Sequence, residues 1–289
     1  MSELHIIIVN YNAGDWLKTA VGSALEHSTA KLSVIDNASS DQSVDTIRAA
    51  FKDEARLEII VNTRNVGFAA ANNQVLQRIQ DDHELDYVVL MNPDCELRHD
   101  TMANIIEVLN GDEKIGMASC RILNEDGSVQ KTCKRRFPTP KTAAVRMFGL
   151  SRFFPQYDFD YGHQETPNNQ NVEIVEAISG AFMVVRRSAL QQVGLLDERY
   201  FMHCEDLDWC KRFQLNNWSV VHVDSAEVTH AKGVSSRARP IGVLWNLHTG
   251  MDRFFSKFYA DTFWPLRILV KVGIYLSFVP RAVMSIVAK

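Results

Sequence analysis

Short runs of apolar residues alternate with stretches of helical periodicity through the first half of the chain. The runs predict strands at Leu4–Asn10, Lys31–Asp36, Leu57–Asn62 and Tyr87–Met91. Helical patterns fall between them, at about 15–27, 41–52 and 67–80. Continuous runs such as Ile6–Val9 are typical of strands buried on both faces. The alternation therefore predicts an α/β fold with a mainly parallel, Rossmann-like sheet flanked by helices.

The second half mixes strands, a long loop and one acidic helix. Residues 115–135 suggest a strand and hairpin around the turn 125–127, and the polar, turn-rich stretch 151–171 predicts a loop or lid. A helix is expected near 205–216. Strands are expected at Glu173–Ala177, Ala181–Arg186, Ser219–Val223 and Glu227–His230.

The C-terminal end is apolar and basic. A helix at Leu266–Val279 would be roughly 21 Å long, against about 30 Å for the hydrocarbon core of a membrane, so it is too short to span comfortably. Arg267 and Lys271 are four residues apart and share one helix face, as in helices that lie in a membrane interface. The alternative is a helix packed on the protein's own core.

Composition and charge place the chain among globular proteins with a basic end. Of its 289 residues, 46% are apolar and 23% are charged, which excludes a disordered chain and a polytopic membrane protein. The net charge of −4 divides into +5 from Arg253 onward and −9 before it. An acidic body argues against nucleic acid as a partner, and the basic end favours an anionic membrane surface.

The five cysteines predict free thiols. Their number is odd, and no pair has the spacing of a zinc knuckle, so buried unpaired thiols are favoured over a metal site at Cys204 and Cys210. Met1 is followed by a strand pattern rather than a signal peptide. We therefore expect the reducing cytoplasm as the compartment.

Polar residues end each of the first four predicted strands. Because ligands bind at the carboxyl ends of parallel strands, these residues predict a site at one edge of the sheet. Asp36 ends a buried strand and needs hydrogen-bond donors, which a ribose or a base could supply, and Arg64 suits a diphosphate. Asp94 is a hard oxygen ligand for a divalent cation bridging that diphosphate. Other residues at these strand ends singly also fit an ordinary turn or helix cap: Asn10, Asn12 and Asn92 suit turns, and Asp41 suits a helix N-cap.

A second acidic cluster opens the helix at 205–216. Glu205, Asp206 and Asp208 complement the helix dipole, but one acid would suffice for that purpose. His230 ends a predicted strand beside a glycine loop, where a histidine is more often structural.

Taken together, these segments resemble the family-two glycosyltransferases of GT-A fold, and especially bacterial rhamnosyltransferases of cell-surface polysaccharide (O-antigen, lipopolysaccharide) synthesis. The resemblance covers about residues 4–240. It rests on seven pieces in order: IIIVNYN at 6–12, DNASSD at 36–41, NVGFAAANN at 65–73, MNPD at 91–94, SGAFMVVRR at 179–187, FMHCEDLDWCKR at 201–212 and HAKGVS at 230–235.

The resemblance implies a role for each matching residue. Asp206 would be the general base that deprotonates the acceptor hydroxyl, with Glu205 as the rival, and Asp94 with His230 would hold Mg²⁺ or Mn²⁺. The first acid of the usual acid-x-acid metal motif is replaced by Asn92, which leaves the identity of the ion open. The nucleotide sugar would be bound by Asn10, Tyr11, Asp36, Arg64, Gly67, Asn72 and Asn92.

The expected activity follows from the same resemblance. It implies an inverting glycosyltransferase that takes a sugar, with L-rhamnose from dTDP-rhamnose as the expectation, to a polyprenyl-diphosphate-linked saccharide. We expect a glycosyltransferase domain at 1–240, with a nucleotide-binding half at 1–112 and an acceptor half at 113–240, and a membrane-associating tail at 241–289. The enzyme would be peripheral at the cytoplasmic face of the membrane. The alternatives are a sugar-1-phosphate nucleotidyltransferase and a non-catalytic, membrane-docked nucleotide-sugar binder.

Overall fold

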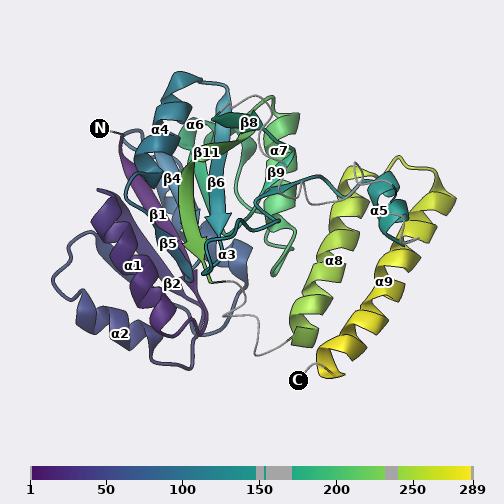
Figure 1. The fold of residues 1–289 in the computed structure, drawn as a ribbon, viewed down its shortest axis with the longest axis horizontal. Coiled ribbons are helices and arrows are strands. Elements are labelled where there is room, and N and C mark those ends of the chain that lie inside the picture. The colour runs from purple at the N-terminus through teal and green to yellow at the C-terminus, as the bar shows by residue number, and fades with distance from the viewer. Residues whose placement is uncertain (1, 148–152, 154–170, 232–239, 288–289) are drawn as a thin grey trace.

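A computed structural model of the protein describes residues 2–147, 153, 171–231 and 240–287. Its centre is a mixed sheet in the order β3-β2-β1-β4-β10-β6-β11-β5, with β8 paired to β11 (Figure 1). The first four strands are parallel and lie within one residue of the predicted bounds: β1 Leu4–Asn10, β2 Lys31–Asp36, β3 Leu57–Val61 and β4 Tyr87–Met91.

Successive side chains of β1 enter two different hydrophobic layers. Ile6 and Ile8 pack with residues of α1 (Asp15–His27), α2 (Ser43–Ala50) and α4 (Thr101–Gly111). Ile7 and Val9 pack on the opposite face of the sheet. The helices on that face are α3 Phe68–Ile79, α6 Arg187–Val193 and α7 Glu205–Leu215. Strands covered on both faces explain the unbroken apolar runs.

The second half of the sheet changes strand direction. β10 (Phe182–Arg186) lies antiparallel between β4 and β6 (Ile115–Leu123). β11 (Ser219–His230) is parallel to β6 and antiparallel to β5 (Cys95–Leu97), and it also pairs with β8 (Val172–Ile174). The sheet is therefore mixed: its four N-terminal strands are all parallel, whereas its second half combines parallel and antiparallel pairs.

Several predicted bounds differ from the structure. The two strands expected at 219–223 and 227–230 are one strand, β11, whose register with β6 shifts between Val223 and Glu227. The hairpin expected within 115–135 is reduced to a single bridge between Leu123 and Val129. The second arm instead becomes β7 (Lys134–Arg135), which pairs with β9 (Ala177–Ile178). Most of the predicted loop 151–171 lies outside the described residues.

Two antiparallel helices follow the sheet, α8 (Pro240–Phe258) and α9 (Trp264–Val287). They lie beside the α7 side of the sheet, next to α5 (Pro140–Met147) (Figure 1). The start of α8 falls at the predicted boundary of residue 240. α9 runs through Pro280, beyond the predicted end at Val279. Ring contacts of Trp245 and His248 with Phe278 hold this part of α9 against α8, which offsets the hydrogen bond that Pro280 cannot donate. No helix in the described part of the chain has the length and apolarity needed to cross a membrane.

All five cysteines are buried and unpaired, as predicted from their number and spacing. Within the described residues, no three or more His, Cys, Asp or Glu side chains could together enclose a metal ion.

Candidate active site

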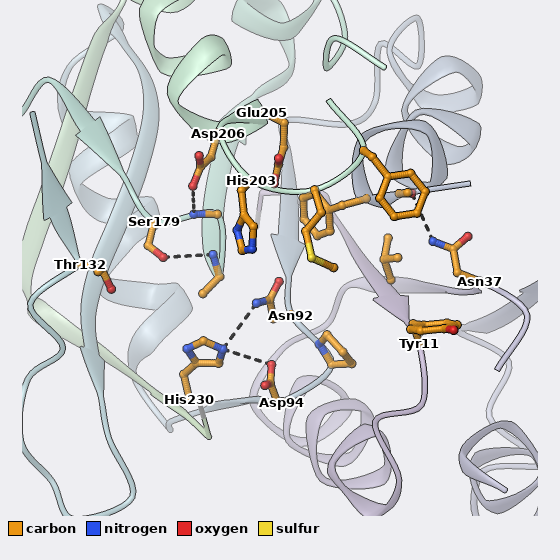
Figure 2. Close-up of a pocket in the computed structure, with 18 of the residues that line it drawn as sticks. Tyr11, Asn37, Asn92, Asp94, Thr132, Ser179, His203, Glu205, Asp206 and His230 are labelled. Carbon is orange, nitrogen blue, oxygen red and sulfur yellow. Dashed lines mark hydrogen bonds and ion pairs between the residues drawn. The ribbon is translucent and has the colours of Figure 1, made fainter. Parts of the chain in front are cut away.

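The carboxyl ends of β1 and β4 meet residues of the second half of the chain around one pocket of about 330 Å³. Figure 2 shows its walls: Glu205, Asp206 and His203 on one side, Asn92, Asp94 and His230 on the opposite side, and Tyr11 with Asn37 on a third. Two of the sequence-predicted groups, the acidic pair and the Asp94/His230 pair, thus face each other across one cavity.

The Asp94 carboxylate and the His230 imidazole are in contact. Asp94 lies just after β4 and His230 is the last residue of β11, and the distance between Oδ1 and Nε2 is 3.1 Å. Both side chains are largely buried, and the backbone N–H of Ala231 donates to the Asp94 carbonyl at 3.0 Å. The antiparallel pairing of β5 with the end of β11 brings these distant segments together, since Cys95 is the register partner of His230.

Gln130 fixes the orientation of the His230 ring. Its Oε1 is 3.3 Å from Nδ1, and its Nε2 donates to the His230 carbonyl at 2.9 Å. An Nδ1–H that donates to Gln130 leaves the lone pair of Nε2 directed at Asp94 and Asn92, as in histidines that bind metals. The pair would offer a divalent cation one carboxylate oxygen and one imidazole nitrogen.

Glu205 and Asp206 begin α7, after an unusual turn. His203 and Cys204, the two residues before them, both have left-handed backbone angles, with φ of 71° and 69°. Such angles are unfavourable for residues other than glycine and are found where surrounding structure holds them. The turn directs both carboxylates into the pocket from the first turn of the helix.

The two carboxylates have different surroundings. Asp206 Oδ2 pairs with the Arg135 guanidinium and accepts from the Gly180 N–H at 2.9 Å, and Oδ1 accepts from the Leu207 N–H at 2.8 Å. Glu205 is as buried, but its Oε2 has no hydrogen-bond partner among the residues that the structure describes. Burial, and next the negative charge of Asp206, raise the pKa of the Glu205 carboxyl to about 8. Asp206 is therefore a carboxylate held by donors, whereas Glu205 is an acid whose ionisation its surroundings oppose.

The residues predicted to bind the nucleotide sugar divide into two groups. Tyr11, Gly67 and Asn92 line the pocket. Gly67 has φ of 88°, and a Cβ there would lie 2.6 Å from the Phe201 carbonyl oxygen, so only glycine fits this close approach.

The other four predicted residues, Asn10, Asp36, Arg64 and Asn72, do not line the pocket. Asp36 is buried at the end of β2, where it accepts hydrogen bonds from Asn10 Nδ2 at 2.7 Å and from the backbone N–H and the hydroxyl of Ser39. Asn72 is buried within α3 and donates to the Phe68 carbonyl, and Arg64 is exposed. Their direct contact with a nucleotide stays a prediction.

Comparison with known proteins identifies the family. Residues 5–194 match the family described as Glycosyl transferase family 2. The chain belongs to this family.

Two relatives of the chain are named as rhamnosyltransferases. The chain is 28% identical over 278 residues to an N-acetylglucosaminyl-diphospho-decaprenol L-rhamnosyltransferase of Mycobacterium tuberculosis, covering 91% of this chain and 89% of the relative. It is 25% identical to the rhamnosyltransferase WbbL of Escherichia coli, over 57% of this chain and 60% of the relative. The predicted family and its similarity to rhamnosyltransferases are confirmed.

A solved structure of a mannosyltransferase from Pyrobaculum calidifontis, in complex with GDP-Man and Mn²⁺, has the same fold. It superposes with a TM-score of 0.60 at 16% sequence identity, over 99% of this chain and 74% of that one. The predicted GT-A type of α/β fold is thereby confirmed.

The match to the glycosyltransferase family also removes the basis for the nucleotidyltransferase alternative.

Sequence reasoning missed several residues of this glycosyltransferase pocket. Arg135 lies in the two-residue strand β7, Gln130 in the segment before it, and Ser179 after β9. The sequence signal for them was weak, since residues 130–137 follow no strand of the parallel sheet. The segment Ser179–Arg187 belongs to the family resemblance, but the sequence predicts no site role for Ser179.

Proposed function

We propose that this glycosyltransferase is an inverting, metal-dependent enzyme that transfers a sugar from a nucleoside-diphosphate donor to a hydroxyl of a lipid-linked saccharide. The expected donor is dTDP-rhamnose and the expected acceptor is a saccharide on a polyprenyl diphosphate. The observation that carries the proposal is the position of the Glu205/Asp206 pair across the pocket from the Asp94/His230 pair.

Inverting transfer needs two opposed charges. A base must take the proton of the acceptor hydroxyl on one face of the sugar, while negative charge develops on the leaving diphosphate at the other face. The pocket offers a fixed carboxylate on one side and a ligand pair for a cation on the other. A single displacement between them inverts the anomeric centre.

Asp206 is the proposed base. Its carboxylate pairs with the Arg135 guanidinium and is held by two backbone N–H groups, so it already has a fixed orientation in the pocket wall. Glu205 lies next to it in the same wall of the pocket, and we assign to it a hydrogen bond to a sugar hydroxyl.

Asp94 and His230 would hold Mg²⁺ or Mn²⁺. The chemistry that the ion supplies is neutralisation of the charge on the departing diphosphate. Gln130 keeps His230 in the tautomer that leaves Nε2 free to bind, and Asn92 lies close to the same nitrogen. Tyr11 and Asn37, on the third wall, are placed to contact the nucleoside part.

We also propose that the enzyme works at the cytoplasmic face of the cell membrane. A polyprenyl-linked acceptor lies in a membrane, and the five unpaired, buried cysteines agree with a reducing compartment. The name of the mycobacterial relative, which specifies a decaprenol-linked acceptor, supports the acceptor class.

The test is a screen of nucleotide sugars with Mg²⁺ or Mn²⁺, with and without a synthetic polyprenyl-diphosphate saccharide. Release of nucleoside diphosphate that depends on acceptor, and a product of inverted anomeric configuration by NMR, are expected. A product with retained configuration would refute the single displacement, and tight donor binding without turnover would favour the non-catalytic binder.

A further inference from the structure

The α8–α9 hairpin is joined to the folded body by α8. Phe254 of α8 is fully buried and stacks on Phe137, which follows the Arg135 strand. The ammonium of Lys257 pairs with the carboxylates of Asp208 at 2.6 Å and Asp197 at 2.9 Å. These contacts make α8 part of the acceptor half of the enzyme rather than a detached tail.

The inner side of α9 packs on α8. Val270 and Ile274 form a small buried cluster with Phe255 of α8, and His248 Nε2 lies 3.2 Å from the Ser277 hydroxyl. The two helices therefore pack on each other, and the side of α9 that faces away from α8 is its outer side.

The outer side of α9 is an exposed apolar stripe. Its residues follow one another at intervals of three or four and remain 47–66% exposed: Ile268, Val272, Leu276, Val279 and Val283. The stripe runs along about 22 Å of helix. A continuous apolar face of this length on a helix that already has its own packing partner marks an interaction surface.

The positive charge of α9 indicates which kind of surface binds the stripe. The helix contains no acidic residue, and it carries Arg267, Lys271 and Arg281. Lys271 pairs with Asp252 of α8, yet its side chain is still 40% exposed at the flank of the stripe. Two large aromatic side chains, Phe263 and Trp264, are 71% and 67% exposed where the helix begins. A second copy of the chain would place one cationic helix against another, whereas an anionic lipid surface complements both the charge and the aromatic residues.

We propose that the outer stripe of α9 docks the enzyme on an anionic membrane surface, with α9 lying along the plane of the headgroups. This inference rests on the proposed function, because a lipid-linked acceptor must be reached from such a surface. Arg267 donates to the Ala260 carbonyl and Lys271 pairs with Asp252, so burial of the stripe provides most of the attachment, and the positive charge of α9 favours anionic lipids.

Docking would also set the distance of the pocket from the membrane. α8 touches the turn before the acidic pair, where Gly250 approaches so closely that a Cβ would lie 2.8 Å from the His203 carbonyl oxygen. A surface bound by α9 is thus connected through one rigid helix to Glu205 and Asp206.

The test is sedimentation of the full chain with vesicles of phosphatidylcholine, with and without phosphatidylglycerol. The double variant Leu276→Ser/Val279→Ser removes two apolar side chains from the stripe. Its partition coefficient onto anionic vesicles should be at least about tenfold lower than that of the parent, since each apolar side chain buried in the membrane contributes to binding. The control Val61→Ser/Leu215→Ser alters side chains that are 50% and 63% exposed elsewhere on the surface, and it should bind as the parent does.

The outcomes separate docking from catalysis. The stripe variant should keep the parent's release of nucleoside diphosphate with a short water-soluble acceptor. Equal sedimentation of parent and stripe variant would overturn the docking proposal, as would a parent dimer in light scattering that the variant loses, because a second copy would then cover the stripe. Vesicle binding lost in the variant, with no turnover of any nucleotide sugar by the parent, would instead refute the proposed function and leave the docking face intact.

Discussion

The Arg135 guanidinium pairs with the Asp206 carboxylate in the wall of the pocket, across 71 residues of sequence. Arg135 also donates to the Ile178 carbonyl, which ties it to the neighbouring strand β9. With the Gly180 and Leu207 N–H groups, Arg135 leaves Asp206 a single orientation. A preorganised carboxylate of this kind suits a base that must act without rearrangement.

Replacing Asp206 by Asn should remove the base and keep the fold. We expect kcat to fall by about 10²- to 10⁴-fold while the affinity for the donor nucleotide changes little, because a missing base affects the transition state more than the ground state. Steady-state kinetics and calorimetric donor binding measure the two effects separately. Glu205→Gln is the matched control and should be the less impaired variant. A larger loss of kcat in Glu205→Gln than in Asp206→Asn would identify Glu205 as the base.

Stability should depend on pH through Glu205. Its pKa is raised from 4.5 to about 8, so between these values the folded protein binds more protons than the unfolded chain. The free energy of unfolding therefore decreases as pH rises through this window, by at most about 1.4 kcal/mol per pH unit from this group. Glu205→Gln cannot ionise and should lose that slope.

Urea unfolding of the parent and of Glu205→Gln at pH 5, 6.5 and 8 measures this difference. The variant should gain stability relative to the parent as pH increases. Glu96→Gln, which changes an exposed glutamate of β5, serves as the control and should follow the parent at every pH. A constant difference between parent and Glu205→Gln would mean that the pKa of Glu205 is not raised.

Activity should require a divalent cation bound through Asp94. Asp94→Ala should abolish turnover, and EDTA should do the same to the parent until Mg²⁺ or Mn²⁺ is restored. Circular dichroism checks that the variant remains folded, and Mn²⁺ binding followed by electron paramagnetic resonance in the presence of nucleoside diphosphate provides a readout independent of turnover. Glu96→Ala, two residues away and exposed, should keep activity and binding. Turnover of Asp94→Ala in EDTA would end the metal assignment.

Gly250→Ala should damage catalysis from a helix outside the pocket. A Cβ at Gly250 would press on the His203 carbonyl at 2.8 Å, so α8 or the left-handed turn at His203 and Cys204 must shift. A small displacement of Glu205 and Asp206 should lower kcat by about tenfold or more. Gly22→Ala is the matched helical control, because its Cβ would meet only Phe51 at an ordinary 3.6 Å. Full activity in Gly250→Ala would show that α8 does not position the turn.

The parallel half of the sheet could be predicted from the sequence, because strands buried on both faces carry unbroken apolar runs such as those of β1 and β4, and this signal is local. The motifs were equally local, so Tyr11, Gly67, Asn92, Asp94, Glu205, Asp206 and His230 were named from the sequence, and the structure gathers them around one pocket.

Only the tertiary structure decided which distant residues complete that pocket. Arg135 reaches Asp206 because its strand pairs with β9 rather than folding back on β6, and Gln130 reaches His230 across 100 residues. It also brings Asn10 and Ser39 to Asp36, so that both donate hydrogen bonds to its carboxylate. The sequence pattern indicates which residues must be buried and which buried polar groups need a hydrogen-bond partner. Which distant residue becomes that partner depends on how the strands pair across the whole chain.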